Sequence, residues 1–160
     1  MYPVLRPLVV LALLFTLVTV AHGQDESHRS YYDNHRVFGA ALQASTPYAD
    51  YAEDYDAGFG VHGIMDYPLA TLFSLVGDMG WNRFRGADGR DDIDVWEFSA
   101  GGKFNIPPFY MGGEVAYYTK VDNVNWLPSM GLRFERWEFA VRWKAAERVG
   151  WVSYRVGYYF

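Results

Sequence analysis

The sequence contains no cysteine, so disulfide bonds cannot stabilise the fold, which must rest on hydrogen bonding and packing alone. After the first 23 residues there is no long apolar run and no helical periodicity, which argues against a membrane-spanning helix. An excess of positive charge is also lacking: the net charge is −5. Because phosphate binding needs a basic surface, nucleic acid is not expected as a partner.

The N-terminus has the features of a secretory signal peptide. Arg6 precedes an apolar run from Leu8 to Val20, and a small-x-small site ends at Gly23. The alternative is an uncleaved anchor, but this run is shorter than the roughly 20 residues that a spanning helix needs. We therefore predict a signal peptide over 1–23, a polar periplasmic segment over 24–36, and a single domain over 37–160.

The remainder is rich in aromatic residues (19%) and contains 16 glycines, a composition typical of strands and turns. Apolar residues alternate with polar or small ones, so that each segment has one apolar face. In the segment from 137 to 146, for example, Trp137 and Phe139 oppose Glu138 and Arg142. Eight strands are predicted, at 37–45, 57–66, 71–84, 92–105, 109–121, 125–135, 137–146 and 150–160.

Two architectures fit this pattern: a soluble barrel or sandwich with its apolar face inside, and a membrane barrel with that face toward lipid. The other face carries charges of both signs and many small residues, such as Gly101 and Gly131, which suit a crowded interior. Five tryptophans lie on the apolar face near strand ends, where interfacial girdles are found. These predicted membrane-interface aromatics are Trp81, Trp96, Trp126, Trp137 and Trp143.

The predicted fold is therefore all-β, an eight-stranded antiparallel up-and-down transmembrane β-barrel. The short connections "DYPLA", "NIPPF" and "ER" lie on one side, and longer acidic connections lie on the other, as in outer-membrane barrels. Pro128 fits poorly inside a closed sheet, and we interpret it as a β-bulge. A secreted soluble barrel that binds a hydrophobic ligand, as lipocalins do, is the alternative.

The chain ends on the alternating stretch "VSYRVGYYF". This ending resembles the assembly signal of Gram-negative outer-membrane barrels, with Tyr154, Val156, Tyr158 and Phe160 in the matching positions. As a pattern, the mature chain resembles the small OmpX-like and OmpA-transmembrane-domain barrels. The resemblance implies location in the cell outer membrane, with outer-membrane lipid and the barrel-assembly machinery as partners.

Eight strands leave an interior just wide enough to be filled by side chains. If Glu135 and Arg136 form a two-residue turn, Arg133 lies opposite Glu138 inside the barrel. A salt-bridged plug is the favoured interpretation, with a narrow ion pore as the alternative. The predicted interior charge network is Glu97, Lys103, Glu114, Arg133, Glu138, Arg142 and Arg155.

No enzymatic activity, cofactor or metal is expected. His62, Ser74 and Asp78 form a nominal Ser-His-Asp set if His62 lies opposite Ser74, but all three face inward, where a lipid ester cannot reach. The His-x-Ser pair of lipid A deacylases of this shape is also missing, since no histidine follows His62.

Two predicted loops are rich in carboxylates. One carries Asp50, Glu53, Asp54 and Asp56 among tyrosines, and the other carries Asp88, Asp91, Asp92 and Asp94. Neither has the spacing of an EF-hand, so solvated loops are the simplest interpretation. Calcium binding stays open as an alternative, as does a surface partner at loop 46–56, which the tyrosines favour.

Overall fold

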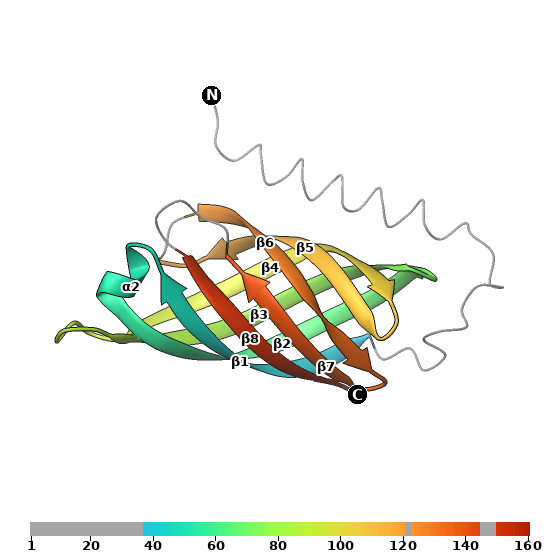
Figure 1. The fold of residues 1–160 in the computed structure, drawn as a ribbon, viewed down its shortest axis with the longest axis horizontal. Coiled ribbons are helices and arrows are strands. Elements are labelled where there is room, and N and C mark those ends of the chain that lie inside the picture. Colours follow the sequence, from blue (N-terminus) through green and yellow to red (C-terminus); the bar gives the residue numbers. More distant parts are fainter. Residues whose placement is uncertain (1–36, 121–122, 145–149) are drawn as a thin grey trace, which may run out of the picture.

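The computed structural model describes residues 37–120, 123–144 and 150–160; the predictions for 1–23 and 24–36 lie outside these residues. Eight strands form a closed barrel in which each strand pairs with its sequence neighbours (Figure 1). A short helix, α2 (Tyr51–Asp54), joins the first two strands. The strands are β1 (Phe38–Tyr48), β2 (Tyr55–Ala70), β3 (Phe73–Gly86), β4 (Ile93–Ile106), β5 (Phe109–Tyr118), β6 (Asn123–Phe134), β7 (Trp137–Trp143) and β8 (Gly150–Tyr159).

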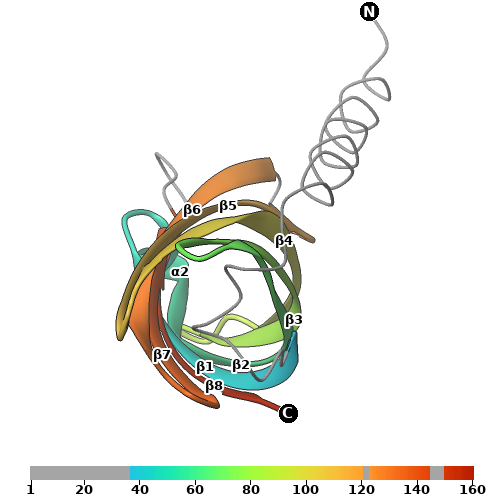
Figure 2. The same ribbon diagram turned by 90° about the vertical axis from the view of Figure 1, so that its right-hand side faces the viewer.

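All pairs of neighbouring strands are antiparallel, which confirms the predicted all-β up-and-down barrel. Pairing of β1 with β8 closes the ring, from Gly39 with Tyr159 to Tyr48 with Gly150 (Figure 2). The amide of Phe160 also donates to the carbonyl of Phe38, at 3.2 Å. The last strand is therefore bonded almost to its final residue. Among the described residues, no helix has the length and apolar character needed to cross a membrane.

The polarity of the barrel is the reverse of that of a water-soluble protein. Along β1 and β4, exposed and buried residues alternate, and the exposed ones are mostly apolar. Leu42, Met79 and Trp126 are each more than half exposed, at 66%, 57% and 55%. In contrast, Glu97, Lys103 and Arg142 are buried. The apolar face of the strands therefore points outward, and the charged face points inward.

The turn between β2 and β3 differs from the sequence prediction. The stretch "DYPLA" belongs to the end of β2, and the chain reverses at Thr71 and Leu72. A register shift between Pro68 and Ala70 accommodates the proline, which pairs with Ser74. His62 consequently lies opposite Gly80 rather than Ser74, so the predicted pairing of His62 with Ser74 is wrong.

The predicted bulge at Pro128 is also wrong. Pro128 pairs with Gly113 in a β5–β6 ladder that has no register shift. On the other side of β6, the described pairing with β7 begins at Ser129 and Arg142, one residue beyond the proline. Proline has no backbone N–H to donate, and Pro128 lies outside the described β6–β7 ladder, where that donor would be needed.

The two acidic loops contact each other at the end of the barrel that carries α2, here called the loop end. Arg90 Nη2 lies 2.8 Å from Asp54 Oδ1, and the Ala87 amide donates to the Asp54 carbonyl at 3.0 Å. Arg83 Nη2 binds Asp92 at 2.9 Å, and this hydrogen bond lowers the pKa of Asp92. Basic side chains from the same strands and loops therefore neutralise part of the acidic charge. The opposite end, with the turns before β3, β5 and β7, is called the turn end.

Candidate functional site

The interior of the barrel holds the charged side chains that the sequence singled out. All seven are at most 9% exposed: Glu97, Lys103, Glu114, Arg133, Glu138, Arg142 and Arg155. They come from β4 to β8, where alternation directs every second residue inward. Asp66 on β2 and Asp78 on β3 join them, at 2% and 7% exposed.

The central cluster is organised around Arg142 of β7. Its guanidinium nitrogens lie 2.9 Å from Glu97 Oε1 and 3.0 Å from Glu114 Oε2. A third carboxylate, that of Asp78, lies at 3.4 Å. One guanidinium thus bridges carboxylates from β3, β4 and β5 across the barrel, which a planar group with five donors is suited to do.

Asp78 connects this centre to Arg155 and His62. Arg155 forms an ion pair with Asp78 Oδ2, and His62 Nδ1 lies 2.7 Å from Asp78 Oδ1. The other ring nitrogen of His62 lies 3.1 Å from Asn82 Oδ1. The Asp78 carboxylate is therefore held from several sides, as a buried charge must be to avoid a large desolvation cost.

A second cluster fills the interior toward the turn end. Lys103 Nζ donates to Asp66 Oδ2 at 2.8 Å and to Glu138 Oε2 at 2.7 Å. Arg133 donates to the same oxygen of Asp66, at 2.6 Å. Arg133 is also the cross-strand partner of Glu138, so the register derived from the two-residue turn is confirmed. Here too each carboxylate meets a cation from another strand.

The loop end is closed by an aromatic plug. Tyr51 of α2 packs on Phe84 and Trp151, with ring centroids 5.4 and 5.5 Å apart, and Tyr118 packs edge-on against Trp151 at 4.9 Å. Burial raises the pKa of Tyr51. The plug consists of Tyr51, Phe84, Val95, Ala116, Tyr118, Leu127 and Trp151.

Lys144, just beyond β7, enters this aromatic plug. Its Nζ lies 4.3 Å from the ring centroid of Trp151 and 4.8 Å from that of Tyr118. Burial lowers the pKa of this amine to about 8. Cation–π attraction thus opposes only part of the cost of removing the ammonium from water.

Between the two charged clusters, the described residues line a cavity of about 20 Å³, with polar groups that include Asp78, Lys103 and Glu138. This is room for about one water molecule. A pocket of water is therefore compatible with this part of the interior.

The geometry does not assemble a Ser-His-Asp triad. His62 contacts Asp78, but Ser74 Oγ accepts a hydrogen bond from Asn105 Nδ2 at 2.9 Å, nearer the turn end. His62, Asp78 and Glu97 could in principle offer three ligand atoms within 4.8 Å of one another. Arg142 pairs with Glu97 and Arg155 pairs with Asp78, so both carboxylates of this set are already neutralised by guanidinium groups.

The outward face carries the residues predicted for the membrane interface and for assembly. Trp96, Trp126 and Trp137 are about half exposed, at 48%, 55% and 50%, while Trp81 and Trp143 are partly buried. The sixth tryptophan, Trp151, faces inward in the aromatic plug. The residues predicted for assembly, Tyr154, Val156, Tyr158 and Phe160, lie on the outward side of β8 and at its end, and their role stays a prediction.

No family model and no curated protein matches the chain. Among solved structures, the chain is similar to a KdgM porin, with 12% identity, a TM-score of 0.34, and coverage of 78% of this chain and 99% of that one. The same porin in complex with disordered oligogalacturonate gives 13% identity and a TM-score of 0.35, with the same coverage. The Yersinia pestis outer membrane protein Ail in a phospholipid bilayer nanodisc shows 16% sequence identity and a TM-score of 0.39, with coverage of 76% of this chain and 99% of that one.

These likenesses are distant, and at such TM-scores they say nothing about function. The barrel itself confirms the predicted small eight-stranded architecture.

Sequence reasoning missed Asp66 and Asp78 as members of the charge network. Both occupy the polar set of their strands, so alternation placed them inward. The alternation does not predict which side chains make contact across the barrel. Asp66 and Lys103, for example, are separated by 37 positions in the sequence.

Proposed function

We propose that this protein is a non-catalytic integral barrel of the outer membrane, with a structural or surface-contact role and an interior closed by charged side chains. The observation that carries the proposal is the reversed polarity of the wall. Phe38, Leu42 and Val124 are each more than 60% exposed, while ionised groups fill the inside. In water such a surface would favour aggregation, whereas a bilayer solvates it.

The non-catalytic part of the proposal rests on how the interior groups are used. His62 is bonded to Asp78 and Asn82, and Ser74 is bonded to Asn105. The carboxylates contact cations, so none is presented alone to a cleft. A surface partner at loop 46–56 belongs to the same proposal. There Tyr51 is turned into the aromatic plug, while Asp50, Ala52 and Glu53 are exposed on α2 or beside it.

A narrow ion pore is the second candidate, favoured by the charges of both signs inside the barrel. The aromatic plug and the small cavity favour the closed interior instead. A soluble barrel that binds a hydrophobic ligand is the third candidate. It would need an apolar interior, whereas the described residues of this interior include the carboxylates of Asp66, Asp78, Glu97, Glu114 and Glu138.

Fractionation of expressing Gram-negative cells tests the membrane proposal. We expect the mature chain in the outer-membrane fraction, extracted only by detergent and resistant to carbonate washing. Recovery in the soluble periplasm or culture medium without detergent would overturn the membrane proposal and favour the soluble barrel.

A further inference from the structure

The outer wall is not uniformly convex: it carries an apolar groove of about 910 Å³. Strand register shows how the groove is built, because its lining side chains form two neighbouring outward rows that cross six strands. The row nearer the turn end is Ile106, Phe109, Leu132, Phe139, Val156 and Leu42. The next row is Phe104, Met111, Met130, Val141, Tyr154 and Ala44.

The floor of the groove is the backbone of the inward-facing row between these two. At its middle, Gly131 of β6 lies directly opposite Ala140 of β7. These side chains are the smallest in that inward row, whose other members along the groove include Tyr110, Arg155 and Gln43. The wall can lie closer to the barrel axis where inner side chains are small, which accounts for the groove at β6 and β7.

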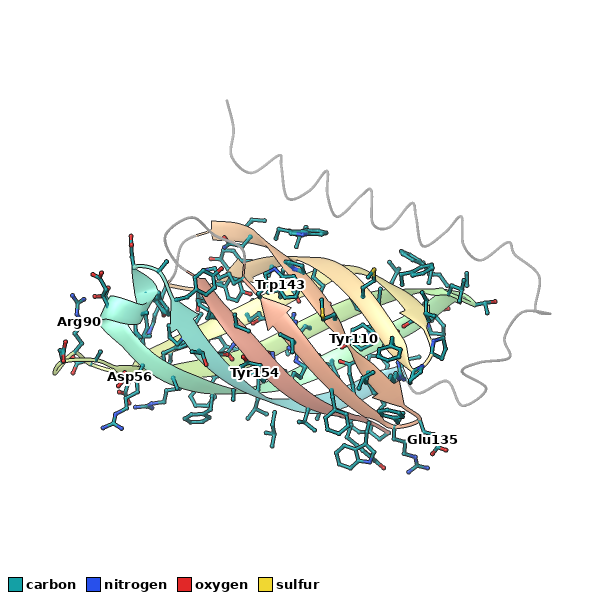
Figure 3. The ribbon with its side chains drawn as sticks, in the orientation of Figure 1. Asp56, Arg90, Tyr110, Glu135, Trp143 and Tyr154 are labelled. Atoms are coloured by element: carbon teal, nitrogen blue, oxygen red, sulfur yellow. The ribbon has the colours of Figure 1, made fainter. Side chains whose placement is uncertain are left out.

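We propose that this groove binds one acyl chain of a membrane phospholipid. The inference rests on the proposed membrane function, and it names a specific lipid contact within it. Among the described residues that line the groove, no outward side chain is charged, and Tyr154, labelled in Figure 3, supplies the one outward hydroxyl. The ligand part that fits is therefore uncharged, apolar and long.

The dimensions suit a single chain of one leaflet. Six strands span five inter-strand spacings of about 4.8 Å, so the groove is about 24 Å long. Strands in such barrels tilt by about 40°, which inclines the rows by about 50° to the barrel axis and makes the groove rise about 15 Å. That is half of the roughly 30 Å hydrocarbon core. A flexible chain conforms to an irregular groove, whereas the rigid wall of a second barrel fills it only if the shapes match.

A cation lies beside the groove on the side that faces the turn end of the barrel, where a head group would be found. Arg136, in the turn between β6 and β7, donates to the hydroxyl of Tyr158 at 3.0 Å. Tyr158 is the next outward residue of β8 after Val156 of the groove, and its ring packs against Trp137 at 5.0 Å. A guanidinium held beside an aromatic pair at the rim is suited to a lipid phosphate.

The test uses a matched pair of methionine variants. Met130 lies in the groove and is 50% exposed, and Met79 lies outward on β3, away from the groove, and is 57% exposed. The wild-type chain, Met130→Trp and Met79→Trp are each folded into phosphatidylglycerol vesicles, extracted in mild detergent, and analysed by native mass spectrometry for retained lipid. We expect the wild type and Met79→Trp to retain one lipid, and Met130→Trp to lose at least tenfold in the retained fraction.

Equal retention by all three folded proteins, or retention by none, would overturn the groove inference while leaving the membrane proposal intact. Failure of the wild type to insert into vesicles at all would instead count against the membrane proposal. If Met130→Trp does not fold, Ala44→Phe replaces it, with Ala100→Phe as its control. Both alanines face outward, and only Ala44 lines the groove.

Discussion

At the scale of the residue, Lys103 shows how a charged interior becomes tolerable. Its ammonium is shared by two carboxylates from different strands, Asp66 and Glu138, and also lies 4.0 Å from the ring centroid of Tyr110. Removing a single partner from such a site leaves a buried charge uncompensated, which costs more than the pair itself contributes.

A double-mutant cycle on Lys103 and Glu138 tests this contact. We expect Lys103→Met and Glu138→Gln each to lower the free energy of unfolding by about 3 to 5 kcal/mol, and the double variant to lose less than the sum. Urea titration of vesicle-inserted protein, followed by tryptophan fluorescence, measures all four states. Arg83→Gln, which breaks the exposed pair with Asp92, is the control and should change stability little. Additive losses would show that Lys103 and Glu138 are not coupled.

Lys144 predicts a dependence of stability on pH. Burial lowers its pKa from 10.5 to about 8 in the folded state, so between these values the unfolded chain binds more protons. Below about pH 8, burial of the charged Lys144 therefore destabilises the folded state in full. This destabilisation is lost as pH rises from about 8 toward 10.5. Lys144→Met should be more stable than the wild type at pH 7, on the order of 1 kcal/mol, with the gap closing by pH 10. A gap that does not change with pH would contradict this assignment.

At the scale of the element, β8 combines barrel closure with the predicted assembly signal. Phe160 is 68% exposed, and its backbone amide is held to the barrel by a hydrogen bond to the carbonyl of Phe38. Its side chain therefore contributes little to packing within the chain, which leaves it available to an assembly factor.

Deletion of Phe160 separates these two roles. We expect a several-fold lower amount of barrel in the outer membrane, with unchanged synthesis and export, and near-normal folding of the purified chain into vesicles. Phe38→Ala is the control, since it removes an aromatic side chain that is 61% exposed at the same rim but not at the terminus. Quantitative blotting of fractions measures the outcome, and equal outer-membrane amounts after deletion would show that the terminal residue is not read.

At the scale of the whole molecule, three groups of side chains fill the described interior from one end to the other. They are the aromatic plug at the loop end, the central cluster around Arg142, and the cluster around Lys103 toward the turn end. Conduction needs a continuous wet path, and the cavity described between the charged clusters is only about 20 Å³.

We therefore expect no stable, stepwise conductance from the purified protein in planar bilayers. Rare openings, if recorded, should be small and should change on charge reversal at Arg142 or Glu114. A protein-free detergent preparation serves as the control. Reproducible single-channel steps from the wild type would contradict the closed interior and place the ion pore first.

Local alternation was enough to predict eight strands, their apolar outward faces, and the inward position of Glu97, Arg142 and Arg155, because side-chain direction in a strand has a period of two. The two-residue turn was also enough to place Arg133 opposite Glu138. The prolines were harder to predict: the sequence favours a turn at Pro68 and a β-bulge at Pro128, whereas Pro68 lies at a register shift within β2–β3 and Pro128 lies just beyond the described β6–β7 ladder.

The tertiary structure alone decided which charges meet. Closure of the sheet brings Lys103 to Asp66 and Arg142 to Asp78, pairs that lie 37 and 64 positions apart. It likewise placed Tyr51 over Trp151 and formed the groove over Gly131 and Ala140. The physical reason is that alternation records only the face on which a side chain lies, whereas contacts across a barrel and the curvature of its wall depend on the register of all the strands together.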